Sequence, residues 1–473
     1  MMDYRTQITS LERALNLEKS FDIQRRPLIL TYGEVSLFTL AGLCSSELAE
    51  RIIRYVLLSN SAEECINNIP CHDVSYSNDI QNLARAVLSG RAVMIAQGCG
   101  RCAVIDIKNF PVRGVDEPEN DRVLRGPRDG FAESLIRNSS LIRRRLNDPS
   151  LVMERFAIGE KCTLDIALCY VDGCADMKLV DSIKKRLSSL NVKALNMTQE
   201  SLAEALIHRG WYNPFPKVRY TERPDAAAAM LEEGSVIILC DNTPQAMILP
   251  TSIFDFLQET DDYYLPPLIG SYLRITRMLI FAVSLILTPL WYYCVQNASS
   301  LPSWLHFLDI DEPAAVPLIL QILLAEFMID GLKLASLNTP NMLNNSLSVV
   351  GGLILGDYAV QAGWFSPQTI LYMAIVAIAA FTQQSYELGY AFKFLRMILL
   401  VLTAIFGLWG FLGGLVLTVL LIAFNKTVSG GRSYLYPLIP FNASAFLRTF
   451  FRIRLNHKKC SCGASKEKKN GAS

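Results

Sequence analysis

The sequence has none of the short motifs that mark the common enzyme classes. It contains no Walker A loop, no G-x-S-x-G nucleophile motif and no H-E-x-x-H zinc motif. Its only histidines are His72, His208, His306 and His457, and their spacing fits no metal site. We therefore expect no enzyme activity, no cofactor and no metal centre.

An excess of charge of one sign is also missing. The chain has 45 Lys and Arg against 44 Asp and Glu, a net charge of +1. A nucleic-acid partner would need a clustered basic face, so none is expected. The stretch Met1–Arg26 is charged throughout and has no apolar core of the kind found in secretory signals. We expect the soluble part to stay in the cytoplasm, with most of its 12 cysteines reduced.

Charged residues become scarce between Met278 and Phe424, where long apolar runs dominate. A span of the hydrocarbon core needs about 20 apolar residues, or somewhat fewer with suitable flanks. The sequence therefore predicts a multi-span helical membrane domain. Its candidate segments are Met278–Val295, Ala314–Leu332, the glycine-rich Ser346–Phe365, the short Thr369–Thr382 and Met397–Phe424.

The placement of Lys and Arg predicts the orientation of these segments. The loop Gln296–Glu312 has neither residue and is expected outside. The basic residues expected inside are Arg274, Arg277, Lys333, Lys393, Arg396 and those of the tail from Arg432 to Lys469. Both termini inside require an even number of crossings. We therefore expect Met397–Phe424, with glycines near its middle, to fold back as a hairpin, and Asn338–Asn341 to form a turn or a re-entrant element.

The soluble part contains one pattern twice. In each copy a strand is followed by a helix with apolar residues at helical spacing, and later by a short helix, a glycine and a β-hairpin. This repeat predicts two related α/β subdomains, at roughly 31–115 and 160–255. The strands and helices of the two copies are Glu34–Leu43, Ser46–Leu58, Ala92–Ala96 and Ala103–Ile107, and then Thr163–Asp172, Met177–Leu190, Ser235–Cys240 and Ala246–Leu249.

The fold class expected is thus an α/β soluble region of two related subdomains plus an all-α polytopic membrane domain. The expected divisions are an N-terminal polar helix (1–30), a first subdomain with a charged connector (31–159), a second subdomain (160–265), a helical membrane domain (266–428) and a basic cytoplasmic tail (429–473).

A few charged residues interrupt the apolar segments. Glu326 and Asp330 are four residues apart and share one helix face. Lys333 lies three residues beyond Asp330 and can neutralise it near the cytoplasmic edge. Glu387 lies between two apolar runs, and Asp357 follows the glycine-rich segment. Burying a charge at the bilayer centre costs at least about 2.5 kcal/mol, so each of these charged residues is expected to have a role that offsets this cost. Either these groups line or gate an ion path, or they form ion pairs that fix helix packing.

Two features of the soluble part could carry chemistry. Arg125, Arg128 and Asp129 surround a tight turn where an anion or an assembly partner could dock, or where Arg–carboxylate pairs only hold the turn. Cys99 and Cys102 have the spacing of a redox pair, which requires the first cysteine at a helix N-terminus. A strand pattern follows Cys102, so we expect the pair to flank a hairpin turn.

Several long and unusual strings are spread along the chain. They are Pro111–Gly114, Arg125–Glu133, Arg143–Pro149, Asn213–Pro224, Pro267–Arg274, Leu324–Asp330, Ser385–Leu388 and Tyr434–Pro440. Over residues of about 20 to 450 they resemble the A-subunit family of bacterial spore germinant receptors. The resemblance implies an oligomeric protein of the spore inner membrane that passes ions when nutrients are sensed.

The resemblance also implies partners. A-subunits work with a transporter-like B subunit and a C lipoprotein, and one branch of the family is associated with the channel that releases dipicolinic acid. The alternative to conduction is a non-conducting scaffold of such a cluster. Gln383 and Gln384 depart from the family pattern, where small or apolar residues and a proline are expected, and could alter a surface facing the lumen.

Overall fold

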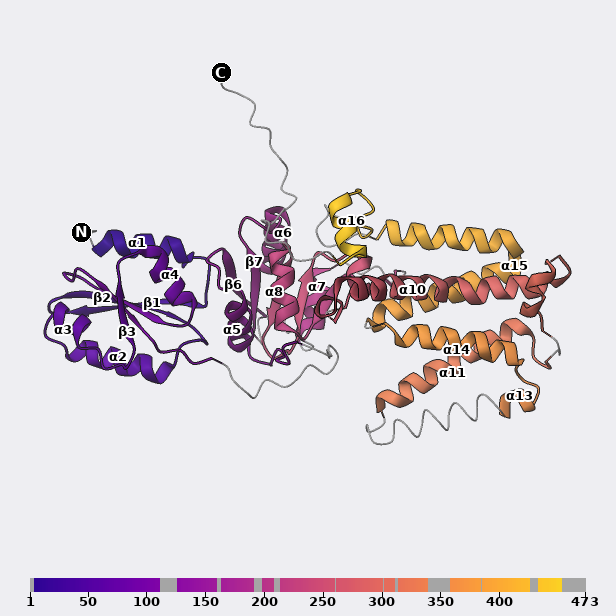
Figure 1. Cartoon of the computed structure of the whole chain (residues 1–473), viewed down its shortest axis with the longest axis horizontal. Helices are drawn as coiled ribbons and strands as arrows, with labels where there is room; N and C mark the ends of the chain where they lie inside the picture. The colour runs from indigo at the N-terminus through magenta and orange to yellow at the C-terminus, as the bar shows by residue number, and fades with distance from the viewer. Residues whose placement is uncertain are drawn as a thin grey trace, which may run out of the picture.

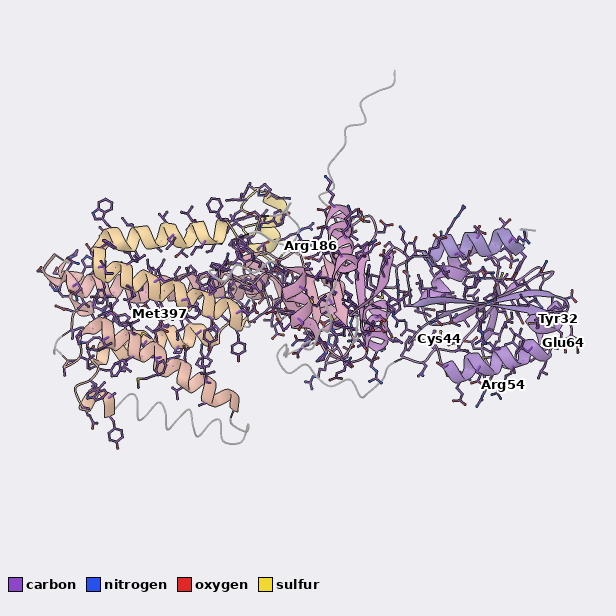
Figure 2. The ribbon with its side chains drawn as sticks, turned by 180° about the vertical axis from the view of Figure 1, so that it is seen from behind. Tyr32, Cys44, Arg54, Glu64, Arg186 and Met397 are labelled. Atoms are coloured by element: carbon purple, nitrogen blue, oxygen red, sulfur yellow. The ribbon has the colours of Figure 1, made fainter. Side chains whose placement is uncertain are left out.

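The chain forms two α/β subdomains and a helical region that follow one another along the long axis of the molecule (Figure 1). Figure 2 shows Tyr32, Arg54 and Glu64 at the end of the first subdomain that is farthest from Met397 in the helical region. The computed structural model describes residues 4–110, 126–159, 163–190, 198–207, 213–259, 261–300, 302–310, 314–338, 358–383, 385–425 and 433–452.

The first subdomain is a five-stranded antiparallel sheet with helices on both faces. Its strand order is β1-β2-β4-β5-β3. The elements are α1 (Tyr4–Leu15), β1 (Ile23–Leu30), β2 (Gly33–Leu40), α2 (Ser46–Leu58), α3 (Ala62–Asn67), β3 (Val74–Ser77), α4 (Ile80–Leu88), β4 (Ala92–Ala96) and β5 (Cys102–Ile105).

Alternating side chains of the central strands fill two separate cores. Val93 and Ile95 of β4 pack with α1 and α4 on one face, whereas Met94 packs with α2 and α3 on the other. Side chains of a strand alternate between the two faces of a sheet, so a strand covered on both sides is apolar at every position. This explains the continuous apolar run Ala92–Ala96, which is buried throughout.

The second subdomain repeats this topology. Its strand order is β6-β7-β9-β10-β8, so each strand has the same position in this sheet as the corresponding strand has in the first sheet. The predicted repeat is confirmed, as is the predicted order of two α/β subdomains followed by a helical region. The elements are α5 (Leu135–Arg145), β6 (Leu151–Ile158), β7 (Leu164–Val171), α6 (Met177–Ser189), α7 (Thr198–Leu206), β8 (Arg219–Thr221), α8 (Pro224–Glu232), β9 (Val236–Cys240) and β10 (Ala246–Leu249).

Two strands lie outside the predicted pattern. β1 pairs with β2, and β6 pairs with β7, so the expected divisions after residues 30 and 159 each separate two strands of one ladder. Both are edge strands with one half-exposed face, and β1 contains Pro27 and two arginines. Proline and charge are tolerated at sheet edges, and they conceal the apolar pattern that reveals a central strand.

A buried ion pair joins the two subdomains. Arg143 of α5 donates to both carboxylate oxygens of Asp22, which precedes β1, at 2.9 and 3.1 Å. Both side chains are almost fully buried. Arg143 also donates to the Leu151 carbonyl oxygen at the start of β6, at 2.9 Å. The same arginine therefore fixes the end of the connector and the first strand of the second sheet.

The helical region contains long apolar helices that lie side by side (Figure 1). Within the described ranges, α10 and α15 are long and apolar enough to cross a membrane, and α14 is a shorter apolar helix. Much of the predicted segment Ser346–Phe365, with Asp357, and the turn residues after Asn338 lie outside the described residues. The elements are η1 (Ile253–Leu257), α9 (Asp261–Tyr264), α10 (Pro267–Gln296), η2 (Ala298–Ser300), η3 (Ser303–Leu308), α11 (Leu318–Asn338), α13 (Ala359–Gln361), α14 (Pro367–Phe381), α15 (Tyr386–Ala423) and α16 (Ala443–Phe450).

The segment α15 is a helical hairpin with two arms, as the sequence predicts (Figure 1). Gly407 has φ +59° and ψ −134°, a conformation that disfavours residues with a Cβ. The arms then pack closely, because a Cβ at Gly410 would overlap the Leu402 carbonyl oxygen and one at Gly414 would overlap the Leu399 side chain. The glycines thus make the turn and the contact between the arms.

Candidate functional site

The core of the helical region contains a cluster of four charged side chains from two helices. Glu326 of α11 is buried and accepts hydrogen bonds from Arg396 of α15, with Oε1 2.7 Å from Nε and 2.6 Å from Nη2. Arg396 also donates to the Ser284 carbonyl oxygen of α10, at 3.1 Å. One arginine therefore connects three helices and neutralises a carboxylate that would be costly to bury alone.

Asp330 lies one turn after Glu326, on the same face of α11, as its spacing predicts. It forms an ion pair with Lys393 of α15. Lys393 also donates to the Glu326 carbonyl oxygen at 3.0 Å and lies 3.6 Å from Glu326 Oε2. The second oxygen of Asp330, Oδ1, is buried and has no hydrogen-bond partner among the described residues. Asp330 is thus the less satisfied of the two acids.

A small cavity of about 40 Å³ lies beside this cluster, lined by Asp330, Lys333, Gln383 and Tyr390 among others. One water occupies about 30 Å³ of liquid, so the cavity holds roughly one. The Lys333 Nζ lies 5.4 Å from the centre of the Phe381 ring and 5.8 Å from that of Tyr390, within range of cation–π attraction. Lys333 therefore faces the cavity and its aromatic wall.

Glu387 lies outside the four-charge cluster, in the first turn of α15. There it lines a larger cleft of about 580 Å³ between the second subdomain and the turn that joins α14 to α15. Three residues of that turn, Gln383, Ser385 and Tyr386, line both the cleft and the small cavity. The atypical Gln383 therefore lies where the two spaces meet.

The sequence reveals the acids of this site but not their partners. Lys393 and Arg396 appear there only as charges that mark a cytoplasmic helix end, yet both are nearly buried beside Glu326. Their spacing of three places them on one helix face, just as the spacing of four does for Glu326 and Asp330. Charges inside membrane helices usually pair with one another, so the matched spacing is a signal that could have identified the pairs.

The turn that contains Arg128 and Asp129 is tied to the rest of the protein. Asp129 pairs with Arg145 at 2.5 Å, and Arg223 donates to the Pro127 carbonyl oxygen at 3.2 Å. A Cβ at Gly126, which has φ +117°, would overlap the Tyr264 ring. Arg128 is exposed, and Arg125 lies outside the described residues. These contacts favour a structural turn for Asp129, and an anion or assembly contact at Arg128 stays a hypothesis.

A second buried charge cluster joins the soluble part to the first long helix. Asp262 of α9 is fully buried and accepts from Arg274 at 3.1 Å and from Arg277 at 3.2 Å, both in α10. Arg277 also pairs with Glu259 at 2.5 Å, and Arg274 donates to the Arg448 carbonyl oxygen of α16 at 3.0 Å. Arg274 and Arg277, in the N-terminal half of α10, thus contact both the segment that contains α9 and the helix α16.

Cys99 and Cys102 flank the turn between β4 and β5, as expected from the strand pattern. Both are free thiols, and Cys102 is buried at the start of β5. Burial raises the pKa of the Cys102 thiol to about 11. A redox pair needs a thiolate at working pH. This environment therefore disfavours thiol chemistry at Cys102.

Comparison with known proteins identifies the family. The family described as Bacillus/Clostridium GerA spore germination protein matches residues 11–461. The chain is 35% identical over 441 residues to Stage V sporulation protein AF of Bacillus subtilis (strain 168), covering 92% of this chain and 89% of that protein. It is 32% identical over 394 residues to the uncharacterized membrane protein YfkQ of the same organism, covering 82% and 76%.

A solved structure gives a further match. The crystal structure of the N-terminal domain of the A subunit of the Bacillus megaterium spore germinant receptor GerK3 is 24% identical, with a TM-score of 0.37. The match covers 51% of this chain and 92% of that one. The two long apolar helices, together with relatives that are spore proteins, indicate a membrane-associated spore protein. The chain belongs to the GerA family of spore germination proteins.

Proposed function

We propose that the protein is an oligomeric subunit of the spore inner membrane that conducts or gates ion release during germination. It would cross the membrane several times, with both termini in the cytoplasm. Its partners would be further copies of itself and other germination proteins, either receptor B and C subunits or dipicolinic acid channel proteins. The observation that carries the proposal is the four-charge cluster with its cavity inside an apolar helical region.

The geometry of the cluster supports a gate that rests in a closed state. Glu326 and Arg396 hold α11, α15 and α10 together, and Lys393 bridges Glu326 and Asp330. Separating α11 from α15 would expose Glu326 and Asp330 on α11, and Lys393 and Arg396 on α15, to the space between the helices. In this proposal cations pass along the α11 side, where carboxylates in a cavity of low dielectric attract them strongly.

The cleft at Glu387 supports a route from the soluble side to this gate. Gln383 lies between the cleft and the cavity, and its Oε1 is buried without a hydrogen-bond partner in the described part of the chain. Lys333 lines the cavity from α11. In this proposal Glu387 lies at the mouth, Gln383 separates the two spaces, and Asp330 and Lys333 line the inner one.

The same cluster supports the alternative, a non-conducting scaffold. Glu326 is buried and contacts two cationic side chains, which is the arrangement expected of an ion pair that only fixes helix packing. In that case the partners would depend on the protein for assembly and ions would pass elsewhere.

Replacing Asp330 with asparagine separates the two functions. Asp330 is about a quarter exposed, so the change should leave the amount of folded protein near that of wild type. It also leaves Lys393 with the more distant Glu326 carboxylate, at 3.6 Å, and without the Asp330 carboxylate at the cavity. A positive charge there should repel cations. We therefore expect potassium flux through purified protein in liposomes to fall at least about tenfold, because raising the barrier to passage by about 1.4 kcal/mol is enough for that decrease.

The matched control is Glu47→Gln, an exposed acid on α2 that pairs only with a neighbour on its own helix. Its flux should equal that of wild type. Equal flux in the Asp330→Asn protein would refute a path at this site. Absence of flux in the wild-type protein itself, with normal incorporation into liposomes, would favour the scaffold.

A further inference from the structure

A groove of about 630 Å³ lies on the first subdomain, far along the chain from the charged cluster. It is formed by the edge strand β3, the helix α4 and the residue before β4, with Asn147 of the connector at its border. Its polar lining includes Ser75, Ser77, Arg85, Ser89, Arg91 and Asn147. This volume is in the range of pockets that bind small molecules.

The charge of the groove is positive. Its lining residues include Arg85 and Arg91 but no aspartate or glutamate. The acid paired with Arg91 is Asp106, whose Oδ2 lies 3.6 Å from Arg91 Nε and 3.3 Å from Lys108 Nζ. The Asp106 carboxylate is therefore shared by two cationic side chains, those of Arg91 and Lys108. Arg91 Nε is buried, and the described residues provide no hydrogen-bond partner for it.

Neutral donors surround the two arginines. Ser75 and Ser77 are two residues apart on β3, so they project to the same side of the strand. Among the described strands β3 pairs with β5 alone, so no described strand covers the backbone groups along its other edge. Hydroxyl groups, backbone N–H groups and forked guanidinium groups are the donors that proteins use to hold phosphate and carboxylate oxygens.

The equivalent edge of the second sheet shows that the fold does not require this charge. β8 occupies the position of β3, and the cleft beside it has Glu200 and Glu222 with a single arginine, Arg219. The spaces beside these two edge strands therefore differ in charge, although the cleft at β8 is lined by α7 and the helical region and not by α8, the counterpart of α4. The arginines beside β3 are a property of this sequence and not of the sheet architecture.

We propose that this groove binds a small anion that carries phosphate or carboxylate groups. Arg85 and Arg91 would hold the charged oxygens, and the serine hydroxyls and the edge of β3 would hold the remaining ones. The site is independent of the proposed ion path, because its residues belong to the first subdomain alone apart from Asn147. A ligand there would give the soluble region a binding function of its own.

The test is titration calorimetry of the full chain in detergent micelles. Inorganic phosphate and citrate are the two probes, each compared with sodium chloride at equal ionic strength. We expect saturable binding of at least one probe and none of chloride, and the probe that binds distinguishes phosphate from carboxylate recognition. Arg85→Gln, at an exposed helix position, should weaken binding about tenfold, the loss expected for one charge-assisted contact.

Two further variants make the result specific. Arg91→Lys keeps the charge but removes the guanidinium fork, and it should weaken binding by a similar factor. Arg54→Gln, an exposed arginine on α2, which packs on the opposite face of the sheet, should leave binding unchanged. The proposal is overturned if neither probe binds, or if the Arg85→Gln protein binds with the affinity of wild type. It is also overturned if Arg54→Gln weakens binding as much as Arg85→Gln does.

Discussion

Replacing Arg396 with methionine is expected to destabilise the helical region by about 3–5 kcal/mol, the usual cost of leaving a buried charge without its partner. Glu326 would keep only Lys393, at 3.6 Å, in place of the two short hydrogen bonds from Arg396. The bond that holds α10 through the Ser284 carbonyl oxygen would also be lost. Thermal unfolding of the purified protein in detergent, with the amount recovered from membranes, measures the effect.

The double variant Arg396→Met with Glu326→Gln is the informative control. It removes both charges, and replacing both members of a buried pair is often nearly neutral. We therefore expect it to recover most of the lost stability. If the double variant is stable yet passes no ions, the pair has a role in conduction beyond packing. An Arg396→Met protein as stable as wild type would contradict the buried pair itself.

Replacing Asp262 with asparagine should have a comparable effect at the other buried cluster, again about 3–5 kcal/mol. Asp262 is fully buried and is the shared acceptor for Arg274 and Arg277, so the change leaves two cations with too little negative charge. Since these arginines lie in the N-terminal half of α10 and bind the segment before it, the expected result is a loosened junction between the soluble part and the helices. Limited proteolysis around residues 255–275 and thermal unfolding both report it.

Glu259→Gln is the matched comparison for that change. Glu259 is a quarter exposed and pairs with Arg277 at 2.5 Å, and partly exposed pairs contribute about 1 kcal/mol or less. It should resist proteolysis nearly as well as wild type. If the two variants behave alike, the burial of Asp262 does not determine the strength of the junction.

The soluble fold could be predicted from sequence where strands are buried on both faces. The runs at Ala92–Ala96 and Val236–Cys240 are apolar at every position because helices cover both sides of each sheet. The edge strands β1 and β6 were not predicted, because their exposed faces carry charged residues. Their partners, β2 and β7, are the next strands along the chain, so what the sequence lacks at β1 and β6 is the apolar pattern and not proximity of the partner.

In the candidate site, the spacing of residues within one helix could be predicted from the sequence, whereas the contacts between helices could not. The spacing of Glu326 and Asp330 is local, and it correctly places both on one face of α11. That Lys393 and Arg396 meet them depends on how α11 packs against α15, across more than 60 residues of chain. Buried arginines such as Arg143 and Arg274 were hidden for the same reason, because a charged residue is expected at the surface until its partner is known.

If α15 inserts into the bilayer as proposed above, its hairpin form has a consequence for insertion during synthesis. Its two arms are joined at Gly407 by a turn with no charged residue, and Arg396 and Asn425 lie toward the open end. A helix pair of this kind can partition from the translocation machinery as a preassembled unit, since no hydrophilic stretch has to be carried across. Substitutions at Gly410 or Gly414 that prevent the arms from pairing would then act first on membrane insertion, before any mature protein exists.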